Sequence, residues 1–230
     1  MNLRNSLVLA PLSVLLTACV TAPQQPLQLS ANAISSKDSK VGVAMKALPK
    51  VDTQFPGAGC LLCLAAASVA NSALTSHTQT LPYEDLPKLK NDVANLLGKK
   101  GANVTVIADN IDVEALPSYS GKESNAAKKD FSALKQKYSI DRLVVIEINT
   151  LGMERPYSSY IPTNAPAAIL QGTGYMVNLS NNTYEWYMPV RITKYADGEW
   201  DEPPKFPGLT NAYFNVIENG KDDFLKPFAN

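Results

Sequence analysis

The chain has 230 residues, with 21 lysines and arginines balanced by 21 aspartates and glutamates. Without a strongly basic stretch, nucleic acid is not expected as a partner. The length suits one medium-sized domain, which we place at residues 41–230, after a leader and a linker.

The first nineteen residues fall into three parts. Residues 1–6 are polar and carry Arg4, and residues 7–16 are apolar but shorter than the roughly twenty that a spanning helix needs. Leu16-Thr17-Ala18-Cys19 follows, and the whole pattern resembles the signal peptide and lipobox of bacterial lipoproteins. The resemblance implies removal of residues 1–18 and acylation of Cys19, with palmitate as one of the fatty chains. The alternative is an ordinary secreted protein with a chance cysteine.

Several acyl chains on one cysteine hold a protein to a membrane essentially permanently. Val20 and Thr21 follow the cysteine, where an Asp often signals inner-membrane retention in such lipoproteins. The resemblance therefore favours the outer membrane, with the domain facing the periplasm. Residues 19–40 have no sustained apolar period, and we expect them to form a flexible tether.

The first half of the domain alternates between strand and helix patterns. We expect a strand near 41–48, where apolar residues alternate, and a buried, Ala- and Leu-rich helix over 60–78 that lies close against a sheet. A stripe of leucine and valine at helical spacing follows over 86–96, and a short strand is expected near 103–108.

The alternation continues in the second half. A stripe at spacings of four, three and four predicts a helix over 127–138, and the apolar run at 142–150 is typical of a strand covered on both faces. A last helix is expected over 209–228. We predict an α/β fold: a single three-layer-like domain with a mixed sheet and packed helices.

Two further strands, near 171–180 and 183–193, are expected to pair as an antiparallel hairpin. Asn181 and Asn182 suit a two-residue type I′ turn, because asparagine tolerates positive φ.

That turn sets the register of the hairpin. It places Val177 opposite Trp186, and we expect both to pack on the same core face. Pro189 cannot donate to a ladder, which puts its strand at an edge or at a bulge.

The order of elements and the hairpin resemble periplasmic modules related to the amino-terminal domain of TolB and the curli secretion protein CsgG. The resemblance spans about 41–194 and rests on residues 143–148, Val177, Leu179, Tyr184 and Trp186. It implies a protein that binds other envelope proteins or forms rings, and it transfers no site residue.

Cys60 and Cys63 stand three residues apart at the start of the expected helix. At that spacing the Cα atoms can meet the roughly 4.4–6.8 Å that a disulfide requires, and the periplasm is oxidising. So small a loop contributes only about 2 kcal/mol. A structural disulfide, two buried thiols and a thioredoxin-like redox pair remain open.

Other chemistry has little support in the sequence. His77 is the single histidine, and a structural zinc site normally takes four ligands, so we expect neither a metal nor a cofactor. No motif surrounds a catalytic nucleophile. We expect a turn at 57–59 and a solvated acidic loop at 197–202.

The segment 152–168 is long for a connection and holds three prolines beside Tyr157, Tyr160 and Ile161. Aromatic groups on a stiff backbone lose little entropy on binding, so we expect these residues to contact a partner. The alternative is that the rings cover the sheet. We expect a protein that binds envelope proteins or its own copies, and not an enzyme; the alternative is a thiol redox protein using Cys60 and Cys63.

Overall fold

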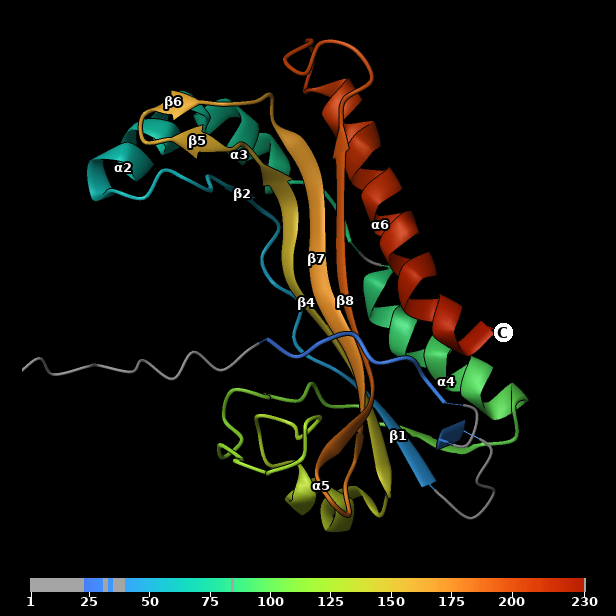
Figure 1. Ribbon diagram of the computed structural model, residues 1–230. Helices are drawn as coiled ribbons and strands as arrows, with labels where there is room; N and C mark the ends of the chain where they lie inside the picture. Colours follow the sequence, from blue (N-terminus) through green and yellow to red (C-terminus); the bar gives the residue numbers. More distant parts are fainter. Residues whose placement is uncertain (1–22, 31–32, 35–39, 84, 230) are drawn as a thin grey trace, which may run out of the picture.

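The computed structural model describes residues 23–30, 33–34, 40–83 and 85–229. A long twisted sheet forms the centre of the molecule, and an arm projects from one end of it (Figure 1). The strands are β1 (Lys40–Met45), β2 (Asp52–Gln54), β3 (Asn103–Val106), β4 (Arg142–Glu154), β5 (Tyr157–Ser158), β6 (Ile161–Pro162), β7 (Ala167–Asn178) and β8 (Thr183–Tyr195). The helices are α2 (Leu61–Ala70), α3 (Ser72–Thr78), the 3₁₀ turn η1 (Leu86–Lys88), α4 (Leu89–Lys99), α5 (Ser132–Tyr138) and α6 (Pro207–Ala229).

The main sheet is mixed, as predicted. Its order is β3-β1-β4-β7-β8, with β1 parallel to β3 and β4, and with β7 antiparallel to both β4 and β8. β2 adds a short parallel pairing at the far end of β4. The prediction of a single α/β domain is confirmed.

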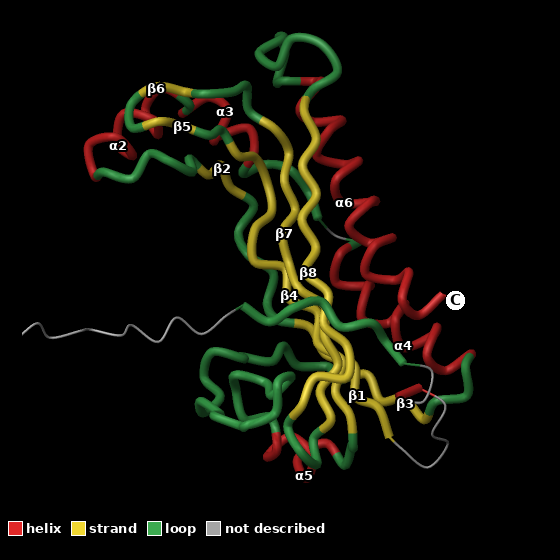
Figure 2. The backbone as a smooth tube through the Cα atoms, viewed as in Figure 1, coloured by secondary structure: helices red, strands yellow, loops and turns green. Residues whose placement is uncertain are grey.

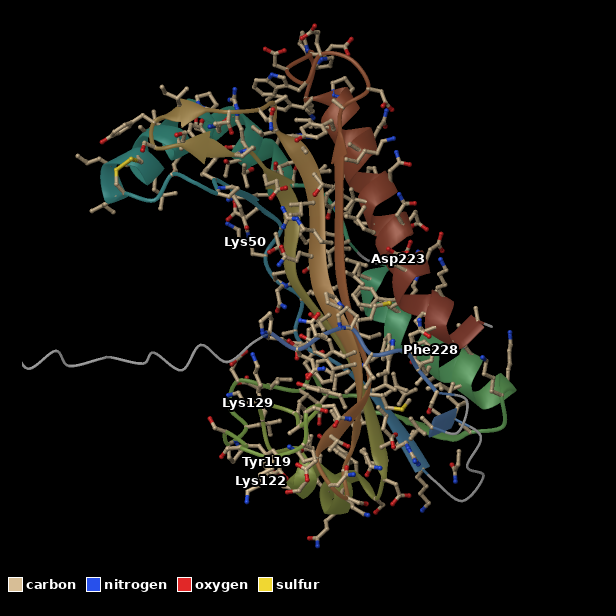
Figure 3. The ribbon with its side chains drawn as sticks, viewed as in Figure 1. Lys50, Tyr119, Lys122, Lys129, Asp223 and Phe228 are labelled. Atoms are coloured by element: carbon tan, nitrogen blue, oxygen red, sulfur yellow. A yellow bond between two sulfur atoms is a disulfide. The ribbon has the colours of Figure 1, made fainter. Side chains whose placement is uncertain are left out.

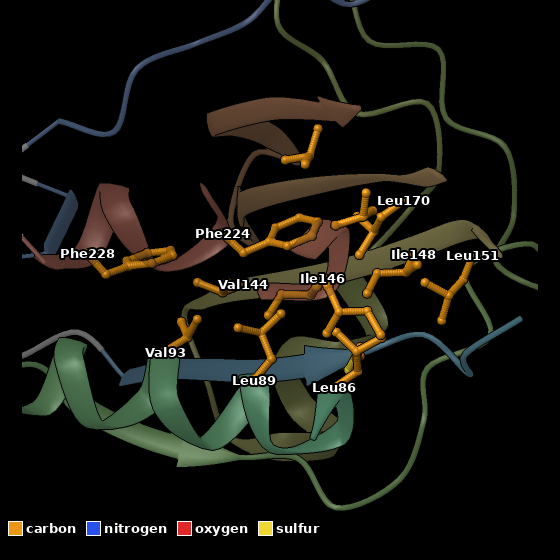
Figure 4. Close-up of a cluster of buried hydrophobic side chains, with 14 of the residues drawn as sticks. Leu86, Leu89, Val93, Val144, Ile146, Ile148, Leu151, Leu170, Phe224 and Phe228 are labelled. Carbon is orange, nitrogen blue, oxygen red and sulfur yellow. The ribbon is translucent and has the colours of Figure 1, made fainter. Parts of the chain in front are cut away.

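Helices cover both faces of this sheet, which gives the expected three layers. On one face, α4 and α6 bury a large cluster that includes Val93, Val144, Ile146 and Phe224 (Figure 4). On the other face, α5 and the segment before it cover a second cluster that includes Val145. Neighbouring residues of β4 therefore serve opposite cores, as the two-residue period of a strand requires.

The expected helix over 127–138 is only partly present, because α5 begins at Ser132. Ala127 and Phe131 are buried, but they lie in the preceding loop. Their backbone amides donate to Asn182, at its main-chain oxygen and its side-chain Oδ1, both at 2.9 Å. Contacts with the hairpin turn therefore replace the first turns of the predicted helix.

The hairpin exists, but its predicted register is wrong. Asn178 pairs with Thr183 across a longer turn, and of the two asparagines only Asn182 has a positive φ, of 56°. A type I′ turn requires positive φ at both central residues. The side chain of Asn182 is instead committed to the loop before α5, where its Nδ2 donates to the carbonyl of Lys129 at 2.8 Å.

A bulge then moves the two predicted core partners to opposite faces. Val177 pairs with Tyr184, Glu185 is left over, and Trp186 pairs with Met176. Val177 consequently packs under α5, whereas Trp186 packs under α6. The carboxylate of Glu185 binds Arg142 Nε at 2.5 Å, an interaction that fixes the bulge.

Part of the predicted tether lies on the domain. Leu27 forms an antiparallel bridge with Tyr187 at the open edge of β8, and the two backbone hydrogen bonds have nitrogen-to-oxygen distances of 2.8 and 3.0 Å. Leu29 packs against the α6 side of the sheet, and Ala33 and Ile34 are buried there. Apolar residues in this stretch thus cover a strand edge. The expected signal peptide, lipobox and Cys19 lie outside the described residues.

None of the helices in the described part of the chain is both long and apolar enough to cross a membrane. The backbone trace shows instead that the sheet itself is extended (Figure 2). β4, β7 and β8 run the full length of the sheet beyond β1 and β3, and the ends of β4 and β7 lead directly into the arm.

Candidate docking surface on the arm

The arm consists of β2, α2, α3 and the small β5–β6 hairpin, and it grows from the ends of β4 and β7. β2 runs parallel to Gly152–Glu154 at the end of β4. Gly152 has a φ of +136°, and a Cβ at this position would lie 2.1 Å from the carbonyl oxygen of Asp52. The glycine is required because the two backbones approach too closely for any side chain.

A small core of its own holds the arm together. The ring of Tyr157 is buried and packs edge-on against Phe55, with centroids 6.0 Å apart. The hydroxyl of Tyr157 accepts a hydrogen bond from Asn71 Nδ2 at 2.7 Å, and Arg155 donates to Asn71 Oδ1 at 2.8 Å. Buried Asn71 therefore joins the break between α2 and α3 to the hairpin.

The turn before α2 is fixed in the same way. Gly57 has a φ of +87°, and a Cβ there would lie 1.9 Å from the carbonyl oxygen of Tyr157. A turn lies over residues 55–58, where the amide of Ala58 donates to the carbonyl of Phe55 at 3.2 Å, and it overlaps the turn expected at 57–59. Gly57 in this turn contacts the β5–β6 hairpin.

Cys60 and Cys63 are joined by a disulfide at the outer end of the arm, visible as the yellow bond on α2 in Figure 3. Cys60 is exposed at the N-cap, where its sulfur accepts the amide hydrogen of Cys63 at 2.9 Å, and Cys63 is buried. The hydroxyl of Tyr160 lies 3.7 Å from the Cys60 sulfur. The structure thus brings the cysteine pair and the predicted contact loop together.

The surface of α2 differs most from expectation. The sequence predicts a buried helix against the sheet, yet only Cys63 and Ala67 of its ten residues are buried. Leu61 is 84% exposed. The prediction is wrong because β4 and β7 carry the helix away from the main cores, and no other element covers it in the described part of the chain.

Tyr160 and Ile161, from the tip of the β5–β6 hairpin, are exposed beside this helix, and Ile161 is 69% exposed. Of the ten large apolar side chains exposed in the described ranges, six lie on the outer part of the arm. We call these six the apolar patch: Leu61, Leu62, Leu64, Val69, Tyr160 and Ile161. Tyr157 is not part of it, because its ring is only 7% exposed inside the arm.

The patch is also free of charge. Residues 53–83 contain no Asp, Glu, Lys or Arg, and neither do residues 156–184. These two stretches supply α2, α3 and the hairpin. Sequence reasoning missed the part of this surface that α2 supplies, although a signal exists: the residues of α2 are apolar on all sides, so the helix has no polar face to turn toward water.

Polar clusters elsewhere have structural roles. His77, in α3, hydrogen-bonds Thr210 at 2.8 Å, and its pKa is lowered by burial and then by the charge of Lys205. On the α5 face, Tyr175 donates to Glu147. Burial, and then the Glu147 carboxylate, raises the pKa of Tyr175 well above its usual value. This phenol therefore stays protonated at neutral pH.

Potential metal ligands do not gather in the described residues: no group of three or more His, Cys, Asp or Glu is placed to hold an ion. The acidic loop at 197–202 is largely exposed. The arrangement with the most marked departure from an ordinary protein surface is the apolar patch.

No protein-family model matches this sequence, and no curated protein matches it. Among solved structures, it is similar to the PelC dodecamer from Paraburkholderia phytofirmans, at 11% identity over 89% of this chain and 95% of that one, with a TM-score of 0.37. Protein XCC0632 from Xanthomonas campestris shares 12% identity over 81% of each chain, with a TM-score of 0.40. Lipoprotein GNA1162 from Neisseria meningitidis shares 10% identity over 79% of this chain and 96% of that one, with a TM-score of 0.31. Likeness at these scores establishes neither a shared fold nor a shared task.

Proposed function

We propose that this protein is a lipid-anchored component of the bacterial envelope, held at the outer membrane through acylated Cys19 and facing the periplasm. It acts as a binding or assembly accessory and not as an enzyme. The observation that carries the binding role is the apolar patch, which an isolated protein in water would expose at a cost.

The anchor is supported by the sequence of residues 1–19, whose charged start, short apolar segment and small residues before Cys19 fit a lipoprotein signal. The linker is short, because only three residues separate Cys19 from Pro23, where the described chain begins. Acylation would therefore keep the domain close to the membrane surface.

The apolar patch supports a binding role, because burying its side chains against another component would be favourable. Complete burial of one large apolar side chain contributes about 1.5–3 kcal/mol. Several such side chains on a rigid arm can together outweigh the entropy cost of association, which is of order 4–15 kcal/mol. A component of the envelope that covers the patch would gain this free energy.

Two experiments in cells test this proposal. Palmitate labelling of the full chain and of Cys19→Ser tests the anchor, and equal labelling of the two would refute acylation at Cys19. A photo-crosslinking amino acid at Leu62 or Tyr160, compared with one at exposed Phe214 on α6, tests the contact role. Adducts with envelope proteins or lipids from the arm alone are expected. If neither arm position gives more adduct than position 214, the docking role is refuted.

The thiol redox function remains as a second candidate, favoured by one observation. Cys60 is exposed at a helix N-terminus, where its sulfur accepts a backbone N–H, an arrangement that stabilises a thiolate. Alkylation with and without reductant tests whether the Cys60–Cys63 pair cycles. A redox role requires that the purified protein reduce a test disulfide and that the double serine variant fail to do so.

A further inference from the structure

The side-chain polar groups on α2 and at its two ends make hydrogen bonds within the arm itself. The hydroxyl of Ser68, the one polar side chain of α2 apart from its cysteine, donates to the carbonyl of Leu64 at 2.8 Å. At the start of the helix the sulfur of Cys60 caps the amide of Cys63. At its end, Asn71 Nδ2 donates to the carbonyl of Ala67 at 2.7 Å. Such internal satisfaction is what a hydrocarbon environment demands of a helix.

The distribution of apolar groups narrows the choice of what covers α2. A rigid protein partner covers one face of a helix, and such helices normally carry a polar face toward water. α2 has apolar residues around its circumference, and only Cys63 and Ala67 face the arm's own core. A fluid hydrocarbon phase surrounds a helix on all its remaining sides, which a single protein surface does not.

The absence of charge in the two stretches that build the arm agrees with this environment. Protein interfaces usually have a polar rim, whereas charges are costly in the apolar part of a bilayer. Tyr160, at the hairpin tip, has the amphipathic ring that is typical of the boundary between headgroups and acyl chains. The exposed Ile161 next to it would lie on the apolar side of that boundary.

The start of the described chain indicates on which side of the sheet a membrane that holds Cys19 would lie. Cys19 lies four residues before Pro23, and an extended chain of that length reaches at most about 14 Å. In Figure 1 both the arm and the start of the segment 23–30 lie to the left of the strands, while α6 lies to the right. The anchored end of the chain and the arm thus lie on the same side of the sheet in this view, with Pro23 beside the 119–128 loop and the arm at the other end of the sheet.

We infer that the apolar patch inserts into the surface of the lipid bilayer that holds Cys19, with α2 in the apolar part of one leaflet and Tyr160 at the boundary between headgroups and acyl chains. A ten-residue helix is about 15 Å long, which is half of the hydrocarbon thickness, so α2 enters one leaflet and does not cross. The inference deepens the proposed function and rests on it, because the acyl anchor keeps the arm at the membrane.

The test uses the full chain purified from bacterial membranes and reconstituted into phosphatidylethanolamine–phosphatidylglycerol vesicles whose acyl chains carry bromine. Leu62→Trp reports on the arm, and Phe214→Trp is the matched control on α6, since both parent residues are exposed and apolar. Bromine quenches a tryptophan only on close approach. The emission that Leu62→Trp adds to the parent should be largely lost, whereas that of Phe214→Trp should persist. Equal urea midpoints of both variants and the parent would show that the fold is kept.

Other results would overturn the inference. Equal quenching of the two added rings would exclude insertion of the arm. Blue-shifted Leu62→Trp emission that bromine does not quench, together with a mass that rises with protein concentration, would show that a second copy covers the patch. The intact mass of the protein separates the two proposals. A mass without acyl groups would refute the lipid anchor, whereas a fully acylated protein with equal quenching of both tryptophans would refute only the insertion of the arm.

Discussion

Gly174→Ala tests the packing between β7 and the ring beneath α6. A Cβ at position 174 would lie 2.4 Å from Cη2 of Trp186, and 3.1 and 3.2 Å from its two neighbouring ring carbons. Ordinary carbon contacts lie near 3.5–4.0 Å, so the ring must move. Trp186 is only 2% exposed, and the centroid of the buried Phe228 ring lies 5.0 Å from that of its own ring, so the indole has little room to move.

The expected cost follows from two opposing effects. Overpacking of a filled core costs about 1–3 kcal/mol, and replacing a strand glycine by alanine returns about 0.5–1 kcal/mol of backbone entropy. We therefore expect the free energy of unfolding to fall by roughly 1–2 kcal/mol. Urea unfolding followed by far-UV circular dichroism measures it, with the midpoint lowered and the slope unchanged.

Gly98→Ala is the matched control, because a Cβ at that position in α4 meets no atom within 4 Å. It should stabilise the protein by about 0.5–1 kcal/mol through helix propensity. In a double variant with Trp186→Leu, the cost of Gly174→Ala should largely vanish, which a double-mutant cycle detects. A Gly174→Ala chain as stable as the parent would refute the packing argument.

Three further predictions concern the arm and pH. Leu74→Ala, in the large core, should destabilise by about 2–5 kcal/mol in urea unfolding, while exposed Leu62→Ala should stay within about 0.5 kcal/mol; equal losses would contradict the exposed position of α2. Replacing Cys60 and Cys63 by serine should lower the free energy of unfolding by no more than about 2 kcal/mol, because the closed loop is so small, and a larger fall in urea unfolding would assign the disulfide a wider structural role. The pKa of His77 is lower in the folded state than the usual 6.5, so the unfolded chain binds its proton first and stability falls as pH drops below about 6.5. His77→Gln should therefore flatten the decline of the thermal midpoint between about pH 7 and 5, and an unchanged decline would assign it to other groups.

The sequence predicts the elements whose pattern is local and regular. The apolar run of β4 marks a strand covered on both faces, and the covering helices α4 and α6 appear where leucine, valine and aromatic residues recur at helical spacing. The spacing of apolar residues in these elements reflects which face of each helix or strand is buried. These patterns were sufficient to predict a mixed α/β sheet.

Long-range contacts decide what the sequence did not reveal. The amides of Ala127 and Phe131 bind Asn182 in the distant hairpin, and this arrangement displaces both the predicted helix start and the predicted turn. The extra Glu185 binds Arg142, far away in the chain, and moves Trp186 to the other face. Neither partner is visible from the pattern of one segment.

The candidate site shows a different limit. Apolar composition predicts that the residues of α2 are buried, but the structure leaves eight of the ten unburied. Whether Leu61 lies in a core or on an arm depends on how far β4 and β7 run, and strand ends are set by packing. The length and prolines of their loop singled out Tyr157, Tyr160 and Ile161; the structure exposes Tyr160 and Ile161 but buries Tyr157, and contact with a partner stays a prediction.

The run of β4 and β7 into the arm, with one irregularity between Ile148 and Thr150, has a mechanical consequence. β4 has thirteen residues and is about 43 Å long, β7 has twelve, and two such strands hydrogen-bonded side by side resist bending within their plane. A force applied to α2 would rotate this pair of strands as a rigid body. The opposite end would move with it, where Asn182 hydrogen-bonds the segment before α5. A partner that fixes the position of α2 thus also fixes the orientation of the sheet end at the β7–β8 turn.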